Sequence, residues 1–400
     1  MRLLHVLARL PAPPNDGGAV YVYNMLKGLH DLGHDLRIVS LVSNKHEQDA
    51  AMTAALGELY AEDGGYKPYS IYSVLKSTIT RQPITVQHRM KPSIAERLLD
   101  QVPDLPDVIL FEGLQTAAFH DVVRKRFPDV PIVLRQVNVE YMLLKNNGLL
   151  SKNPVKKWFY LDQAKLMKRF ELQKMKEADY VTAISENDIL KYKEDLPDVR
   201  YFLNTAGATV PEKSTESRDS NMMLAVSNWR WKPNIDGLIW FFDEIWPLIV
   251  KAHSEIQFHI AGEGLSKSFK EKYDSENVHF LGFVDDISTL RSTASIFVAP
   301  LLSGSGMKLK ILESLAAGLP TVTTRFGAEG INIEDQVHYL HADSADDFGK
   351  AVNQLVRDKN LREKLSARGQ ELIKNSYSWT QKARELSTFL ASIVDKSSNR

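Results

Sequence analysis

Cysteine is absent from this sequence, which excludes disulfide bridges, thiolate metal sites and cysteine nucleophiles. Net charge is also absent, because 50 Lys and Arg residues balance 50 Asp and Glu residues. A neutral chain has no general attraction to nucleic acid, so we expect no nucleic-acid partner and only local anion sites. The apolar start of the chain ends at Arg9 and Pro11, too early for a signal peptide or a membrane span. We therefore expect a cytoplasmic protein.

Several catalytic signatures are missing as well. The sequence has no Gly-x-Ser-x-Gly elbow, no P-loop, and no His, Asp and Glu residues at metal-ligand spacing. Internal repeats and low-complexity tracts are absent too. We expect a reaction that requires neither a metal ion nor a serine nucleophile.

What the sequence does contain is short apolar runs that alternate with segments of helical period, which is typical of an α/β fold with parallel sheets. The runs that predict strands are 3–7, 36–42, 107–111, 131–135 and 179–184, then 222–227, 257–261, 278–281, 295–299 and 321–324. Helical spacing is found in 18–32, 115–127, 236–252, 309–317 and 377–394, and a further helix is expected to begin at Glu186. The alternation stops once and then restarts, which predicts two doubly wound, Rossmann-like domains.

The boundary between the domains is indicated by a polar stretch without aromatic residues. We expect an N-terminal domain over 1–205, a linker over 206–221 and a second domain over 222–376. The segment 377–400 is expected to be a helix that packs back on the first domain. In doubly wound domains ligands bind beyond the carboxyl ends of the strands, so the loops that follow the strands are the candidate sites.

The strongest candidate is the loop that follows the predicted strand 295–299. Gly304, Ser305 and Gly306 can form a nest of backbone N–H groups at the start of a helix, where a diphosphate would fit. Lys308 and Lys310 add positive charge, and Glu313, one turn further on, could accept hydrogen bonds from two ribose hydroxyls. The alternative is an ordinary loop followed by a solvated helix start.

Other loops carry weaker signals. Gly17 and Gly18, at the first helix, permit positive φ angles and a close approach of the backbone to a ligand, or they form a tight turn. Glu329 could bond the hydroxyls of a sugar, and Arg230 could reach a phosphate, although the tryptophans beside Arg230 could simply pack on Pro233. Asn138 and Glu140 follow a strand of the first domain and are the candidate residues facing a substrate.

The segment 156–176 forms a further candidate surface. It combines seven Lys and Arg residues with Trp158, Phe159 and Tyr160. Such a helix could rest on anionic lipid or on a polyprenyl-phosphate acceptor. A solvated amphipathic helix is the alternative.

These motifs together resemble the group 1 (family 4) glycosyltransferases, which are retaining enzymes of the GT-B fold. The resemblance is densest in 227–247, Ala261-Gly-Glu-Gly264, Phe280-Leu-Gly-Phe283, Ala299–Glu313 and Gly327-Ala-Glu-Gly330, and it extends to Asp16-Gly17-Gly18 and Ala183-Ile-Ser-Glu186 in the first domain. It implies a nucleotide-sugar donor, most readily a UDP- or GDP-sugar, held mainly by the second domain. The ribose would then lie at Glu313 and the diphosphate near Gly304–Gly306 and Lys310. A glycan or polyprenyl-linked acceptor would bind the first domain.

The resemblance also implies a mechanism. In this family retention is usually explained by attack on the same face from which the diphosphate leaves, with the diphosphate taking the proton of the acceptor. The protein then contributes positioning and stabilisation of the charge that develops on the diphosphate. We assign catalytic roles to Asn138, Glu140 and Lys310.

The sequence departs from the family at three positions. Many relatives have a glutamate where this chain has Ser305, although the subfamily with the Gly-Ser-Gly motif commonly lacks it. Asn234 stands about where the second cation of the usual Arg and Lys pair would be. Val137 replaces a histidine thought to touch the donor sugar or the reacting centre, so that either Glu112 or His120 serves instead, or the activity is altered or lost.

The predicted function is transfer of a sugar from a nucleotide-sugar donor in the biosynthesis of a surface polysaccharide or glycoconjugate. The enzyme would work in the cytoplasm or at the inner face of the membrane, with peripheral contact through 156–176. The alternative is a catalytically weak GT-B subunit that binds a nucleotide sugar or a partner transferase.

Overall fold

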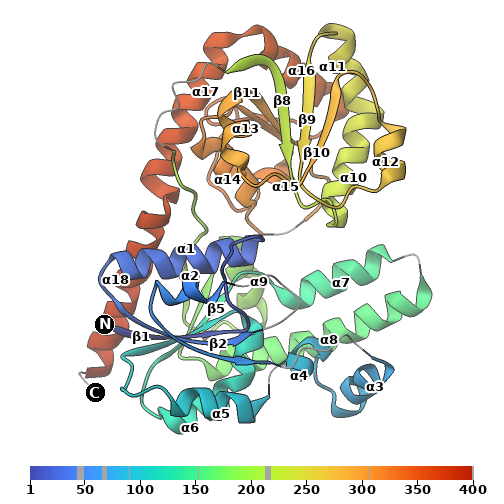
Figure 1. Ribbon diagram of the computed structural model, residues 1–400. Coiled ribbons are helices and arrows are strands. Elements are labelled where there is room, and N and C mark those ends of the chain that lie inside the picture. Colours follow the sequence, from blue (N-terminus) through green and yellow to red (C-terminus); the bar gives the residue numbers. More distant parts are fainter. Residues whose placement is uncertain are drawn as a thin grey trace. The chain divides into compact units, whose positions relative to one another are not determined.

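The protein divides into two compact units, each built on one parallel sheet (Figure 1). The computed structural model describes residues 1–42, 49–64, 70–89, 91–151, 153–211, 218–304 and 306–398. Unit 1 comprises Met1–Thr205 and Lys382–Arg400, and unit 2 comprises Ala206–Gln381. Within these described ranges, no helix combines the length and apolar character that a membrane span requires.

The sheet of unit 1 has seven parallel strands in the order β3-β2-β1-β4-β5-β6-β7. The strands, in that order, are β3 (Glu58–Asp63), β2 (Asp35–Val42), β1 (Arg2–Leu7), β4 (Val108–Glu112), β5 (Ile132–Gln136), β6 (Tyr180–Ala183) and β7 (Tyr201–Leu203). The direction of winding reverses between β1 and β4, and a sheet of this order binds ligands beyond the carboxyl ends of these strands.

The helices of unit 1 follow the strands in the chain. They are α1 (Gly17–Asp31), α2 (Ala50–Ala54), α3 (Ile71–Thr80), α4 (Ile84–Arg89), α5 (Pro92–Asp100), the 3-10 helix η1 (Leu114–Phe119), α6 (His120–Arg126), α7 (Glu140–Leu150), α8 (Pro154–Glu177) and α9 (Glu186–Asp195). The helical segment expected over 115–127 is thus one 3-10 stretch followed by one α-helix.

Unit 2 repeats the architecture with six parallel strands in the order β10-β9-β8-β11-β12-β13. The strands are β10 (Val278–Gly282), β9 (Gln257–Ala261), β8 (Asp219–Val226), β11 (Ala294–Ala299), β12 (Thr321–Thr323) and β13 (Leu340–His341). The helices are α10 (Lys232–Trp240), the π-helix η2 (Phe241–Ile245), α11 (Trp246–Ala252), α12 (Lys267–Lys272), α13 (Ile287–Thr293), α14 (Leu309–Ala316), α15 (Arg325–Ala328), α16 (Ala345–Arg357), α17 (Lys359–Leu372) and the π-helix η3 (Ile373–Tyr377). The last helix, α18 (Trp379–Ser398), begins in unit 2 and lies in unit 1 from Lys382 onward.

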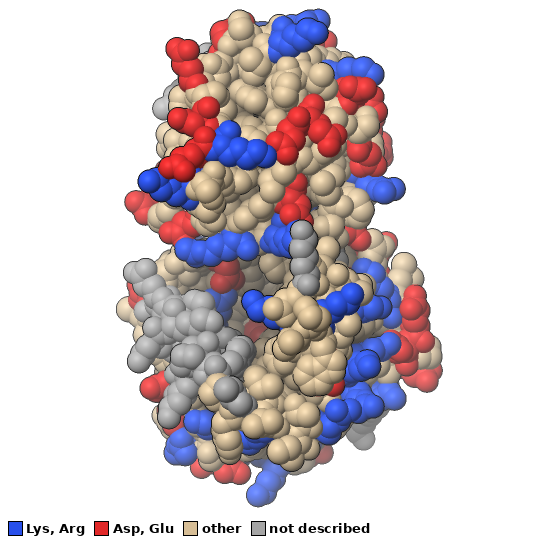
Figure 2. Space-filling model, turned by 90° about the vertical axis from the view of Figure 1, so that its right-hand side faces the viewer, with Lys and Arg blue, Asp and Glu red and all other residues tan. Residues whose placement is uncertain are grey.

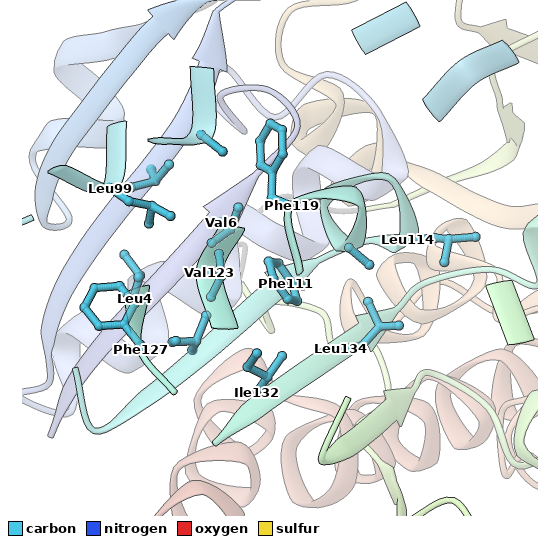
Figure 3. Close-up of a cluster of buried hydrophobic side chains, with 14 of the residues drawn as sticks. Leu4, Val6, Leu99, Phe111, Leu114, Phe119, Val123, Phe127, Ile132 and Leu134 are labelled. Atoms are coloured by element: carbon cyan, nitrogen blue, oxygen red, sulfur yellow. The ribbon is translucent and has the colours of Figure 1, made fainter. Parts of the chain in front are cut away.

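The core of unit 1 fills the space between the sheet and its helices (Figure 3). Phe111 and Leu134 from adjacent strands belong to this core together with Val123 of α6, and all three are fully buried. Nearly continuous apolar strands are expected where helices cover both faces of a parallel sheet. The apolar runs of the sequence therefore identify these strands.

Two predictions about the second half of the chain are corrected. The expected linker 206–221 is too long, because Asp219 already pairs with Ala294 in the sheet. The hydrogen bonds of a β-sheet are made by the main chain, so a strand can begin with polar residues. Residues 212–217 of that linker lie outside the described part. The expected helix 236–252 begins at Lys232 and contains the π-helix η2 just before Pro247. Proline has no N–H to donate, which favours a local change in the helical hydrogen bonds.

The last helix connects the two units. Its start contacts unit 2, since the amide of Ala208 donates to the carbonyl of Tyr377 just before it. From Lys382 onward the chain belongs to unit 1. There the ring of Phe389 stacks on Phe202 at 4.1 Å, and the side chain of Asn204 donates to the carbonyl of Lys382.

Candidate functional site

A lysine lies in a pocket at the carboxyl ends of the two central strands of unit 2. The Lys310 ammonium group, from the first turn of α14, donates to Ser227 Oγ at 2.6 Å and to Asn234 Oδ1 at 2.8 Å. Val226, Trp229 and Pro300 also line this pocket. Burial, together with the neighbouring charge of Lys308, lowers the pKa of Lys310 to about 7. A lysine with such a lowered pKa becomes fully charged when an anion binds next to it.

The pocket also accounts for Asn234, one of the departures noted in the sequence. Asn234 Nδ2 donates to the carbonyl of Asn228 at 2.8 Å, so its oxygen is oriented toward Lys310. The positive charge beside this position therefore comes from α14.

The loop between β11 and α14 has the backbone geometry expected for an anion site. Gly304 and Gly306 have φ angles of 130° and 74°, values that side chains of L-residues rarely permit. Apart from the glycine and its chain neighbours, no atom of the described residues lies within 4 Å of where a Cβ at Gly306 would stand, so the backbone there has space for a ligand. Ser305, the third residue of the expected nest, lies outside the described residues.

Lys308 and Glu329 lie close to this loop. Lys308 Nζ donates to the carbonyl of Gly306 at 2.5 Å and lies 3.9 Å from Glu329 Oε2. Glu329 is the C-cap of α15, the helix that follows β12. The structure thus brings Glu329, which belongs to a separate motif, close to Lys308 beside Gly306.

Glu313 is held by an arginine that the sequence did not suggest. Its carboxylate forms an ion pair with Arg291 of α13, and both side chains are largely buried. The arginine leaves the other carboxylate oxygen available to a ligand, since a carboxylate accepts several hydrogen bonds. The two partners are 22 positions apart in the sequence, so local spacing does not indicate this pair.

Arg230 does not contact the Lys310 pocket through its side chain. It forms an ion pair with Glu263 at 2.7 Å, and both side chains are exposed. The loop is packed tightly, because a Cβ at Gly264 would stand 2.5 Å from the Arg230 amide nitrogen. Trp229 is buried and donates to the carbonyl of Ala261, so this tryptophan is part of the core of unit 2.

The glycines at the start of α1 use no special backbone conformation. Gly17 and Gly18 form the first turn of α1, and neither has a positive φ angle. Asp16 caps the helix by accepting from the amide of Ala19 at 3.0 Å and forms an ion pair with Arg9. The helix begins with ordinary geometry because this cap satisfies a terminal N–H group.

Asn138 and Glu140 lie where β5 leads into α7. The Asn138 carbonyl accepts a hydrogen bond from Tyr192 at 3.2 Å. Burial raises the pKa of Glu140 to about 7, and a hydrogen bond from Gln115 opposes this rise. A carboxyl group with such a pKa can both accept and donate a proton near neutral pH.

A second buried carboxyl group, missed in the sequence, lies next to Glu140. Glu171 of α8 accepts from the amides of Glu140 and Tyr141 at 3.2 and 3.1 Å, and the Tyr192 hydroxyl donates to it as well. Burial raises the pKa of Glu171 to about 8, and the charge of Glu140 adds to this effect. Glu171 thus binds the first amides of α7.

The two residues considered as substitutes for the missing histidine have other partners. Glu112 is buried and accepts from Arg135 at 2.7 Å and from His5 at 2.9 Å. Burial alone would raise its pKa, but Arg135 and His5 outweigh it and the pKa lies below the ordinary value. His120 contacts the carbonyl of Glu177 at 3.1 Å.

His120, Asp121 and Glu177 form a group whose ligand atoms lie within 4.8 Å of one another, in the described part of the chain. Lys174 Nζ lies 2.5 Å from Glu177 Oε2 and 3.8 Å from Asp121 Oδ1. An ammonium group therefore already balances these carboxylates.

Comparison with known proteins gives a family match that lies within unit 2. Residues 220–358 match the family described as "Glycosyl transferases group 1". Over 344 residues, which are 82% of this chain and 84% of the relative, the chain is 22% identical to an "uncharacterized 44.6 kDa protein in cps region" of Klebsiella pneumoniae. Over 108 residues, 26% of this chain and 31% of the relative, it is 34% identical to the lipopolysaccharide core biosynthesis glycosyltransferase LpsE of Rhizobium meliloti.

A solved structure extends the likeness to the whole fold. A variant of S. aureus TarM, in complex with fondaparinux, α-GlcNAc-glycerol and UDP, matches with a TM-score of 0.71. The match covers 98% of this chain and 100% of that chain, at 13% sequence identity. The expected architecture of two Rossmann-like units is confirmed.

Proposed function

We propose that this chain is a group 1 glycosyltransferase that transfers a sugar, with retention of configuration, from a nucleotide-sugar donor to a glycan or lipid-linked acceptor. The relative from a cps region and the lipopolysaccharide core transferase support a role in surface polysaccharide or glycoconjugate biosynthesis. The UDP in the TarM complex supports a UDP-sugar as donor, with a GDP-sugar as the second choice.

The observation that carries this proposal is the Lys310 pocket at the carboxyl ends of β8 and β11. A lysine with its pKa near 7 stands beside a loop whose glycines have positive φ angles. Burial of an amine next to a second lysine is unfavourable unless an anion is bound there, which is the condition that a diphosphate would meet.

We assign binding of the nucleotide-sugar donor to residues of unit 2. The diphosphate would be bound by Lys310, Lys308 and the backbone of Gly304 and Gly306. The ribose would be bound by the Glu313 carboxylate, which Arg291 orients. As the bond to the sugar breaks, negative charge grows on the diphosphate, and the two lysines stabilise that charge.

We assign the acceptor to unit 1. Asn138 and Glu140 stand at the carboxyl end of β5, where hydroxyl groups of an acceptor would be bound. The raised pKa of Glu140 suits a residue that contacts a hydroxyl group of the acceptor substrate. Its protonated form would donate a hydrogen bond to that hydroxyl, and its ionised form would accept one. In the mechanism proposed for this family the proton of the attacking hydroxyl passes to the leaving diphosphate, so Glu140 has a positioning role.

We place the enzyme in the cytoplasm, at the inner face of the membrane, where lipid-linked acceptors are available. A bound metal ion is not part of the proposal, because Lys308 and Lys310 supply positive charge at the diphosphate.

The test is calorimetric titration of the purified protein with UDP-, GDP-, ADP- and dTDP-sugars. We expect micromolar binding of one of them and strongly weakened binding in a Glu313→Ala variant, since two charge-assisted hydrogen bonds of roughly 1.5–3 kcal/mol each are lost. The thermal stability of the variant serves as the control for folding.

Two outcomes would change the proposal. Unaltered donor affinity in folded Glu313→Ala protein would exclude the ribose contact. Absence of binding to every donor, in a folded and monodisperse sample, would favour a catalytically weak subunit. The replacement of the family histidine by Val137 is the reason to consider this alternative.

A further inference from the structure

Helix α3 in unit 1 has its polar side turned inward. Ser73 and Ser77 are buried, with 7% and 0% exposure, whereas Tyr72, Leu75 and Ile79 are 73%, 56% and 80% exposed. The three apolar residues are spaced by three and four positions, so they form one stripe along the helix. A stripe of this kind normally faces the core, and here it faces outward.

Hydrogen bonds fix this orientation of α3. Ser77 Oγ donates to the carbonyl of Gln82 at 2.6 Å and accepts from Gln163 Nε2 of α8 at 3.0 Å. Ser70 caps the helix in a reciprocal pair with Ser73. Rotation of α3 to bury its apolar stripe would break the contacts of Ser77 and leave buried polar atoms without partners, which is costly.

The turn between α7 and α8 exposes a second apolar group. Leu149, Leu150, Val155 and Trp158 are 56%, 46%, 71% and 60% exposed. The two helices pack closely there, since a Cβ at Gly148 would stand 3.0 Å from Leu161. In Figure 1 this turn and α3 lie on the same side of unit 1, and α3 joins α8 through Ser77 and Gln163.

The charge around both groups is mainly positive, and the acidic Asp162, one turn after Trp158, lies 3.8 Å from Arg81 at the end of α3. Between Gly64 and Ala95 the sequence contains five Lys and Arg residues and no acidic residue, and between Tyr141 and Leu161 it contains four Lys and no acidic residue. Lys76, Lys145, Lys156 and Lys157 are exposed beside the apolar side chains. Figure 2 looks onto this side, and in its lower half blue cationic side chains border an uncharged surface.

We infer that this surface, formed by Tyr72, Leu75, Ile79, Leu149, Leu150, Val155 and Trp158 with its surrounding lysines, docks unit 1 on an anionic phospholipid bilayer. The apolar side chains enter the boundary between headgroups and acyl chains, and the lysines bind phosphate groups of the lipids. Apolar side chains that project from two elements, among exposed lysines and with Asp162 already paired to Arg81, complement an anionic lipid surface better than an acidic or neutral protein face.

The inference deepens the location proposed above, and it assigns the contact differently from the lysine-rich helix 156–176. Part of that helix is engaged within the protein, because Lys168 pairs with Asp195 at 2.7 Å and Lys174 is buried beside Glu177. The membrane contact therefore belongs to the end of α8 near Trp158 and to α3.

The experiment is flotation of the full chain with vesicles of phosphatidylcholine alone or mixed with phosphatidylglycerol. We expect binding to the anionic vesicles only, weakening as salt rises, because screening reduces the attraction of the lysines. A Leu75→Ser, Ile79→Ser variant and a Val155→Ser, Trp158→Ser variant should each bind at least about tenfold more weakly.

The matched control is Leu190→Ser. Leu190 of α9 is 60% exposed, as Trp158 is, but it lies among acidic residues of its helix. This variant should bind vesicles like the unchanged protein. Equal loss in the control, or binding that does not depend on phosphatidylglycerol, would overturn the inference.

Two further outcomes separate this inference from the proposed function. The apolar variants should keep their affinity for the nucleotide sugar, since their positions lie outside unit 2. No vesicle binding together with intact donor binding would refute the membrane surface and leave the function standing. Self-association that the Leu75→Ser, Ile79→Ser variant abolishes, without vesicle binding, would identify the occupant as a second copy and also overturn the inference.

Discussion

Substitution of Lys310 can separate the contribution of the diphosphate to donor binding from that of the nucleoside. We expect Lys310→Met to lower the affinity for a nucleoside diphosphate by roughly 10- to 100-fold, because charge-assisted hydrogen bonds of about 1.5–3 kcal/mol are lost. The affinity for the nucleoside alone should stay unchanged. Calorimetry with both ligands measures the difference, and Lys350→Met, which removes an exposed lysine of α16, is the control. Equal losses for the two ligands would exclude the diphosphate role.

The lowered pKa of Lys310 also predicts the direction of the pH dependence. Near pH 7 the free protein holds this lysine partly neutral, and a bound diphosphate requires the ammonium form. Affinity should therefore fall as pH rises above about 7, by at most about tenfold per pH unit, until the pKa of the complex is reached. The Met variant should lack this dependence.

At the scale of elements, the start of α7 depends on a carboxyl group from α8. Glu171 and Glu140 both have a raised pKa, so the folded protein binds more protons than the unfolded chain between the ordinary pKa of 4.5 and about 8. Their contribution to stability is fully present below that ordinary value and is lost as pH rises through the folded-state pKa values.

We expect the free energy of unfolding of unit 1 to fall between pH 5 and pH 8, and Glu171→Gln to reduce that fall by roughly 1–3 kcal/mol. Glutamine can still accept from the α7 amides. Urea unfolding at several pH values, monitored by a probe in unit 1, measures the effect. A variant with the same pH dependence as the unchanged protein would contradict it.

Most elements could be predicted from the sequence because buried parallel strands are apolar along their whole length. The edge strand β3 was missed, since Glu58, Glu62 and Asp63 give it a polar surface without an apolar run. Helix α3 was missed for a related reason: its apolar residues face outward and carry no information about a core.

The candidate site was predictable where it lies in one loop and not where distant segments meet. The motif around Gly304 and Lys310 is continuous in the sequence, so its residues could be named in advance. Arg291 and Glu171 come from other helices, and only the folded chain brings them to Glu313 and Glu140. Pairs of this kind are set by packing, which local spacing does not encode.

At the scale of the whole molecule, unit 1 requires the end of the chain. Leu386 and Leu390 of α18 are fully buried, and Phe389 stacks on Phe202. We expect Leu390→Ala to destabilise unit 1 by about 2–5 kcal/mol, the range for such a substitution in a core. The affinity for a nucleoside diphosphate should change less than about twofold, because Lys310 and Glu313 belong to unit 2.

Thermal unfolding and calorimetry on the same preparation test this prediction. Leu365→Ala, at a buried position of unit 2, is the matched control and should lower stability and nucleotide affinity together. Loss of nucleotide affinity in the Leu390→Ala variant, under conditions where it stays folded, would contradict the assignment of the donor to unit 2.

The return of α18 to unit 1 has a consequence for biosynthesis on the ribosome. Unit 2 is inserted between the two segments that form unit 1, Met1–Thr205 and Lys382–Arg400. A ribosome releases the chain in order, so all of Ala206–Gln381 emerges before the residues that complete unit 1. Unit 2 is therefore the first to be complete in the nascent chain, and unit 1, though its sheet is synthesised first, closes its core only after Lys382–Arg400 has emerged.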